Sequence, residues 1–175
     1  PDIDLLEWHV CPVAGVGGSR MSGGQGIFRL TGSARAAGQV YPWSVIVKVF
    51  NGSDLAGDSS GTAQFPSAWN YWKREILAYQ SGILADLSGN LVAARCFGVM
   101  EHPNDEWRIW LEDIQESPKT WTIARHGIAA RHLGQFNGAY LTGRPLPAEQ
   151  PWMYRGRPRE WIEFAAPLFE GFEHY

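Results

Sequence analysis

Lys48 is the residue of this chain best placed to bind an anion. It is the one charged residue in an apolar stretch, residues 43–50, whose β-branched and aromatic side chains predict a strand. A buried ammonium without a partner is costly, so this lysine must either reach the surface or meet an anion. Upstream, the glycine-rich residues 14–26 could supply backbone N–H groups that close over a phosphate. A strand-end lysine that points to solvent explains the same pattern about equally well.

Glu75 is a candidate partner for this lysine because it lies on the next predicted element. Residues 68–84 predict a helix, with Ser67 as its N-cap. The face of this helix that we expect to be buried is formed by Trp69, Trp72, Ile76, Tyr79 and Ile83. Glu75 lies at the edge of that face. Taken alone, Glu75 is better explained as one more charge on a solvated surface, beside Lys73 and Arg74.

Five strands are expected in the first part of the chain. A polar stretch, residues 32–41, is expected to join two of them as a hairpin connection, and a turn over 102–105 to join the last two. The expected strands are residues 3–13, 27–30, 43–50, 91–99 and 107–111. This order predicts an antiparallel sheet with one helix, over residues 1–115.

The remaining part, residues 116–175, changes from strand to helix patterns. A helix is expected over residues 123–141, closed by Gly143 and Pro145. A loop follows over residues 147–158, and a further helix is expected to begin near Glu160. Together with the sheet, this predicts an α+β chain of two parts.

Composition limits the class of protein. The 175 residues are 45% hydrophobic and have a formal net charge of −3, which disfavours a general nucleic-acid binder. No apolar run approaches the roughly 18 residues of a membrane span, so we expect a cytoplasmic protein with no membrane partner. Cys11 and Cys96 lack metal-ligand spacing and are expected to be small buried side chains of a reducing compartment.

The order of these pieces suits a nucleoside triphosphate. Its phosphates need backbone donors and a cation, and the cation needs a partner that fixes it, such as a glutamate on an adjacent helix. The adenine needs an apolar slot with exposed backbone groups, which residues 111–114 could provide after the last strand. Glu112 and Asp113 could instead form a carboxylate pair, but neighbouring residues on a strand point to opposite sides.

Four segments, WSVIVKVF, NYWKREILAYQSGIL, RIWLEDIQE and RHLGQFNGAYLTGRPLP, resemble the aminoglycoside phosphotransferase and related phosphotransferase family. The resemblance extends over roughly residues 10–175. It implies a protein-kinase-like fold whose small lobe ends near residue 115, followed by the first helices of a helical large lobe. It also implies ATP and Mg²⁺ as cofactors and the transfer of the γ-phosphoryl group to a small-molecule hydroxyl.

The resemblance assigns roles to nine residues. Lys48 matches the phosphate-binding lysine and Glu75 its helix partner. The loop over the phosphates and the hinge beside adenine match Gly23, Gly24, Gly26, Leu111, Glu112, Asp113 and Ile114.

The catalytic motifs of that family are not matched. It uses a His-Gly-Asp base, a nearby asparagine and a second aspartate for magnesium. Here His126-Gly127 is followed by Ile128, and no aspartate lies between His132 and Asn137, so both histidines are expected to be ordinary helix residues. We expect the catalytic residues and magnesium ligands beyond Tyr175, and the chain to be an inactive fragment that binds nucleotide weakly at best.

Two other hypotheses remain open. The first is a non-catalytic kinase-like module that binds nucleotide or a protein partner. The second is a sheet-plus-helix interaction domain in which Lys48 faces solvent. The distance between Lys48 and Glu75 separates the second hypothesis from the kinase. The acceptor, whether an aminoglycoside, a sugar, an amino alcohol or a steroid-like molecule, is not specified by these residues.

Overall fold

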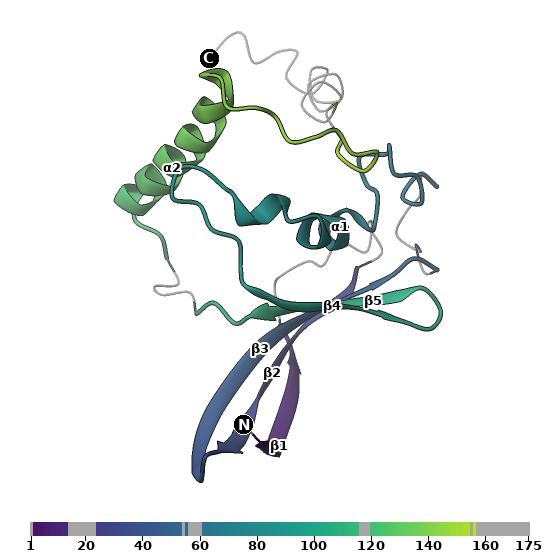
Figure 1. The fold of residues 1–175 in the computed structure, drawn as a ribbon, viewed down its shortest axis with the longest axis vertical. Coiled ribbons are helices and arrows are strands. Elements are labelled where there is room, and N and C mark those ends of the chain that lie inside the picture. Colours follow the sequence, from purple (N-terminus) through teal and green to yellow (C-terminus); the bar gives the residue numbers. More distant parts are fainter. Residues whose placement is uncertain are drawn as a thin grey trace, which may run out of the picture.

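The computed structural model describes residues 2–13, 24–53, 55, 61–115, 120–154 and 156. This part of the chain is α+β, with a five-stranded antiparallel sheet and two α-helices (Figure 1). The elements in chain order are β1 (Ile3–Pro12), β2 (Gly24–Ala36), β3 (Gln39–Asn51), α1 (Arg74–Gln80), the short 3₁₀ helix η2 (Ile83–Ala85), β4 (Cys96–His102), β5 (Glu106–Glu112) and α2 (Ile123–Leu141). The strand order β1-β2-β3-β5-β4 confirms the predicted antiparallel sheet.

Strands β2 and β3 form a longer hairpin than the sequence predicts. They pair from Gly24 opposite Phe50 to Ala36 opposite Gln39, so the expected connection over residues 32–41 is wrong. The turn consists of two residues, Ala37 and Gly38, with φ of 49° and 79°, the type of tight turn that matches strand twist. Residues 32–36 are small or polar, but pairing with both β1 and β3 holds them in the sheet.

The main core cluster lies on one face of the sheet, which we call the helix face because α1 covers it (Figure 1). There, buried side chains of β3 and β5 pack against two from the α1 segment. They are Phe50, Trp107, Ile109, Leu111, Trp72 and Ile76. The opposite side of the sheet, which we call the outer face, has no helix of the described chain over it (Figure 1). Val45 and Val47 of β3 are buried on this outer face.

Helix α1 is shorter than the predicted helix over residues 68–84. It begins at Arg74 and has no side-chain cap, so the assignment of Ser67 as N-cap is wrong. The Arg74 guanidinium explains the difference, because it donates to main-chain carbonyls that a longer helix would use internally. The acceptors are Pro66, Ala68 and Trp69, together with Trp152 from the distant loop. Residues 63–73 therefore form successive turns.

Helix α2 has the predicted bounds. Thr122 is its N-cap and accepts a hydrogen bond from the Arg125 amide, and Gly143 follows its end with φ of 106°. Strand β4 begins at Cys96, later than expected, and only the last part of the predicted strand 91–99 belongs to it. The helix expected near Glu160 lies outside the described residues.

The expected burial is wrong for Cys11 and holds only in part for Cys96, which packs against the core. Cys11 is exposed on the edge strand β1, and Cys96 is half-buried; both are free thiols. None of the helices in the described ranges is long and apolar enough to cross a membrane.

Candidate functional site

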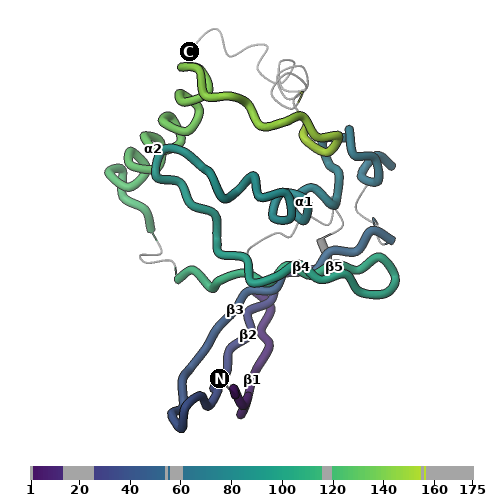
Figure 2. Tube along the Cα trace, in the orientation of Figure 1, coloured from purple at the N-terminus to yellow at the C-terminus, as the bar shows by residue number. Residues whose placement is uncertain are grey.

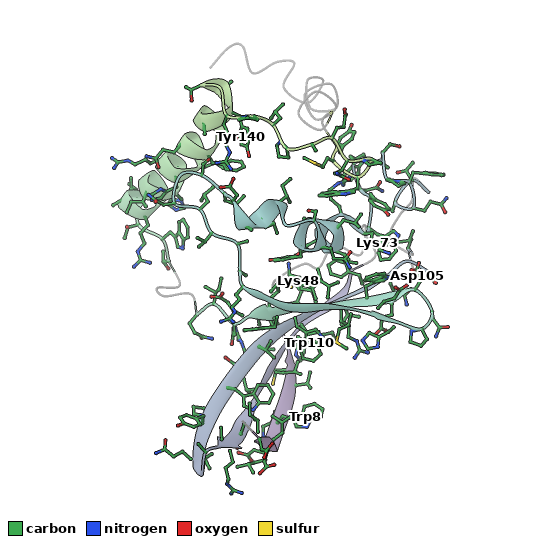
Figure 3. The ribbon with its side chains drawn as sticks, in the orientation of Figure 1. Trp8, Lys48, Lys73, Asp105, Trp110 and Tyr140 are labelled. Atoms are coloured by element: carbon green, nitrogen blue, oxygen red, sulfur yellow. The ribbon has the colours of Figure 1, made fainter. Side chains whose placement is uncertain are left out.

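Lys48 and Glu75 form an ion pair, with 2.6 Å between Nζ and Oε1. Lys48 lies in the middle of the sheet, opposite Ile27 of β2 and Ile109 of β5. It projects from the helix face toward α1 (Figure 3). The predicted pairing is therefore confirmed, and the hypothesis that Lys48 faces solvent without a partner is wrong. The two side chains are 27% and 38% exposed, so the pair remains open to a ligand.

The neighbours of Glu75 on α1 fix its position. Ile76 is fully buried against the sheet and anchors the first turn of the helix. Tyr79 lies one turn further along and packs against the same core. Burial, together with the charge of Glu75, raises the pKa of Tyr79, so this phenol stays neutral beside the carboxylate. Glu75 thus has Lys48 as its cationic partner in this part of the described chain.

A second ion pair, Arg29–Asp113, was not predicted. The guanidinium binds the carboxylate in bidentate fashion, with Nε–Oδ2 at 2.9 Å and Nη2–Oδ1 at 3.0 Å. The Asp113 side chain is only 2% exposed, whereas that of Arg29 is 40% exposed. The hydrogen bond and the charge of Asp113 raise the pKa of Arg29 above its ordinary value. The two residues are 84 positions apart, so no local spacing could indicate the pair.

The Arg29 side chain extends across the sheet, so the Arg29–Asp113 pair lies on the same face as Lys48. Arg29 lies opposite Ile46 of β3, and Ile46 lies opposite Leu111 of β5. To reach Asp113, just after the end of β5, the Arg29 side chain must cross the helix face of β3. The pair therefore bridges three strands at one end of the face on which Lys48 lies.

The predicted hinge residues have different environments. Leu111 is buried in the core, and Ile114 is exposed. Glu112 exchanges hydrogen bonds with Arg95: its amide donates to the Arg95 carbonyl at 2.9 Å, and its carboxylate accepts from the Arg95 amide at 2.8 Å. Asp113 binds Arg29 instead, so the carboxylates of Glu112 and Asp113 have separate partners. A carboxylate pair for acid–base work is not formed.

The three predicted loop glycines are divided between β2 and the preceding segment. Gly23 lies outside the described residues. Gly24 and Gly26 are the first residues of β2, paired with Phe50 and Val49, and an irregularity in register separates them. They are strand residues, not tips of a loop as the sequence analysis expected. The register still brings them next to Lys48, because Ile27, directly after Gly26, lies opposite the lysine.

Both histidines of the partial motifs lie on α2 and make ordinary contacts. The His126 ring packs against Trp121 with centroids 5.4 Å apart, and His132 Nδ1 is 3.3 Å from the Gln135 side-chain oxygen. Within the described ranges, no group of three or more His, Cys, Asp or Glu side chains could hold a metal ion.

A pocket of about 370 Å³ lies apart from the predicted site residues, between η2 and the end of α2. Its lining consists of Gly82, Ile83, Asp86, Tyr140, Arg144, Pro145 and Pro147. Arg144 forms an ion pair with Asp86 at 2.7 Å and lies over the Tyr140 ring. The cation of this pocket is therefore already paired, and its role is to tie the end of α2 to the segment after α1.

Comparison with known proteins gives no match to a family model, a curated protein or a solved structure. The similarity to aminoglycoside phosphotransferases thus stays a prediction from the quoted segments.

Proposed function

We propose that this chain is the nucleotide-binding part of an ATP-dependent phosphotransferase with a kinase-like fold. Residues 1–115 would form the small lobe, and residues 116–175 would begin the large lobe. The observation that carries the proposal is the Lys48–Glu75 ion pair, which joins the centre of the sheet to the helix above it. A cytoplasmic location belongs to the same proposal.

Lys48 would contact the α- and β-phosphates of ATP. The Glu75 carboxylate fixes the position of the Lys48 ammonium. A phosphate that binds there therefore has a smaller loss of side-chain conformational entropy to overcome. The partial exposure of both side chains leaves room for phosphate oxygens to share the ammonium. Gly24 and Gly26, on the neighbouring strand, bring backbone without bulky side chains close to the same place.

The adenine would lie on the helix face beside residues 111–114. The half-buried Ile46 supplies an apolar surface there above the buried Leu111, and the Arg29–Asp113 pair borders it. A planar guanidinium held by a carboxylate can stack against an aromatic base. Arg29 is therefore a candidate to position the base, although no motif indicated it.

The second part of the chain is suited to join a larger helical body. Several large apolar side chains of α2 are exposed, namely Ile123, Ile128, Leu133 and Leu141. In the proposed protein a helical large lobe covers them and supplies the aspartate base and the magnesium ligands. Magnesium would bridge the phosphates and neutralise charge that develops during transfer. The acceptor is a small-molecule hydroxyl bound by that lobe.

Nucleotide binding to the purified chain tests the proposal. We expect weak binding of ATP in titration calorimetry, with Kd on the order of 1 mM, equivalent to about −4 kcal/mol. Lys48→Met should weaken it at least about tenfold, because the phosphates lose their cation. Lys73→Met is the matched control: Lys73 lies over the Trp107 ring, 3.7 Å from its centroid, and its removal should leave ATP affinity unchanged.

Two outcomes would contradict this proposal. Equal ATP affinities in the wild-type chain and in Lys48→Met would remove the phosphate role of Lys48. Phosphoryl transfer by the chain alone, lost in Lys48→Met, would show that a catalytic base lies within these residues. Binding without transfer in a longer protein that includes the following residues would instead favour the non-catalytic module.

A further inference from the structure

Strand β1 is an unusually exposed edge of the sheet. It pairs with β2 alone among the described strands, and all ten of its residues are exposed. Its apolar side chains share the outer face, because Ile3, Leu5, Trp8 and Val10 lie opposite β2 residues of that face. The helix-face positions of β1 are polar or small: Asp4, Glu7, His9 and Cys11. A long, apolar edge strand is a template for pairing with another strand.

The apolar stripe of β1 continues across the sheet. On the outer face it meets Leu30 of β2 and Trp43 of β3. The indole ring of Trp43 packs closely over Gly32, so that a Cβ atom added to Gly32 would lie 2.8 Å from the ring. Trp110 of β5 also projects from this face (Figure 3); its indole nitrogen is buried and has no hydrogen-bond partner in the described chain. The most exposed apolar side chains of this stripe are those of β1, namely Ile3, Leu5, Trp8 and Val10, and a contiguous exposed apolar patch marks an interaction site.

A bulge makes the pattern of β1 symmetric. The register with β2 shifts between Leu5 and Glu7, so Leu6 is an extra residue. Without the bulge, alternation would place Leu5 and Trp8 on opposite faces. With it, apolar and polar residues follow the same order in both directions outward from the two central residues, Leu6 and Glu7, which themselves differ in polarity. A strand with this property can pair with an antiparallel copy of itself and keep like faces together.

The backbone of β1 is oriented for such pairing. The Val13 amide donates to the Ile27 carbonyl of β2 at 2.8 Å, so the backbone groups of Val13 point inward. Because the direction of these groups alternates along a strand, those of Val10 and Trp8 point to the open edge. Residues of β1 whose side chains share a face also have backbone groups that point to the same side. The N–H and C=O groups of the apolar residues on the outer face therefore point away from β2, toward the open edge.

We propose that β1 pairs with β1 of a second copy of this chain, antiparallel, so that two sheets join into one across a two-fold axis. The axis passes between Leu6 and Glu7. The pairs across it are Ile3 with Val10, Asp4 with His9, Leu5 with Trp8 and, at the centre, the bulge residue Leu6 with Glu7. Each apolar pair lies on the outer face, and each Asp4 meets a His9 on the helix face.

Charge supports this register and this partner. In the proposed register a carboxylate meets an imidazole twice in the dimer, and no acid lies opposite an acid. A shift by two residues in one direction would place Asp4 opposite Glu7, which is unfavourable. A shift by one would place most apolar residues opposite polar ones, whereas the proposed register does so only at the central Leu6–Glu7 pair. The chain is thus complementary to itself at one register, and the joined outer faces form one larger apolar surface.

Sedimentation equilibrium of the chain measures the proposed dimer directly. We expect a mass of twice 19.5 kDa at concentrations of about 100 μM, because an interface of one strand pair is small and small interfaces are weak. Val10→Pro should give a monomer, because it removes an outward N–H while leaving the pairing of β1 with β2 intact. A dimer formed by packing of outer faces would survive this substitution.

If Val10→Pro fails to fold, substitutions that change the charges of the Asp4–His9 pair test the proposal. His9→Glu places an acid opposite Asp4 and should weaken the dimer at least about tenfold. Asp4→Lys combined with His9→Glu should restore it, because each lysine then meets a glutamate. A monomeric wild-type chain, a series of larger oligomers, a dimer unaffected by both Val10→Pro and His9→Glu, or failure of the double variant to recover would overturn the proposal.

Discussion

The two α-helices in the described part of the chain form for different reasons. Helix α1 has seven residues and no side-chain cap, but its Ile76 is fully buried against the sheet. Helix α2 has nineteen residues and a Thr122 cap, but none of its residues is buried. Figure 2 shows α1 beside the sheet and α2 away from it. Tertiary contacts therefore stabilise α1, whereas local signals define α2.

Removal of the buried contact should affect α1 most. Ile76→Ala creates a cavity where the side chain is 0% exposed, and we expect a loss of about 2–5 kcal/mol in the free energy of unfolding. Leu133→Ala on α2, where the side chain is 55% exposed, should change it by less than about 0.5 kcal/mol. Urea unfolding followed by tryptophan fluorescence compares the two. Equal losses would contradict the contrast between the helices.

The stability of helix α2 should instead depend on the helix propensity of its own residues. Gly127, Gly134 and Gly138 have open space where a Cβ would lie. Replacing each by alanine removes an entropic cost of roughly 0.5–1 kcal/mol, so the triple variant should gain about 1.5–3 kcal/mol in helix stability. Far-UV circular dichroism during heating would show α2 melting at a higher temperature. Gly32→Ala is a contrasting variant: its Cβ would meet the Glu7 carbonyl, and it should destabilise the sheet.

The same contrast explains what could be predicted from the sequence. The bounds of α2 follow from its cap, its terminal glycine and its apolar spacing, which are all local. The start of α1 depends on Arg74, whose guanidinium donates to carbonyls as far apart in the sequence as those of Pro66 and Trp152. No spacing rule identifies such a contact in advance. The long β2–β3 hairpin was missed because pairing on both sides overrides the weak strand preference of residues 32–36.

The candidate site divides in the same way. Lys48 and Glu75 could be paired in advance because each lies in a strongly patterned element, and because a lysine in an apolar strand needs an anionic partner. Arg29 and Asp113 could not, because their contact depends on the register of three strands. Gly24 and Gly26 were placed in a loop because glycine signals flexibility, but the continuation of the ladder with β3 includes them in β2.

The smallest expected effect concerns pH and the packing of α1. Burial and the charge of Glu75 raise the pKa of Tyr79 above the value of about 10 for an unfolded tyrosine. Above about pH 10 the unfolded chain therefore loses this proton before the folded chain does, and the stability falls as the pH rises. Tyr79→Phe removes that contribution, so its alkaline loss of stability, measured by urea unfolding between pH 8 and about 11, should be less steep than in the wild-type chain. Tyr71, whose pKa is also raised by burial and by Asp105, remains in both proteins and accounts for the part of the slope that persists. Parallel curves would mean that the phenol of Tyr79 is as accessible in the fold as in the unfolded chain, and that α1 does not pack against the sheet as closely as Ile76 indicates.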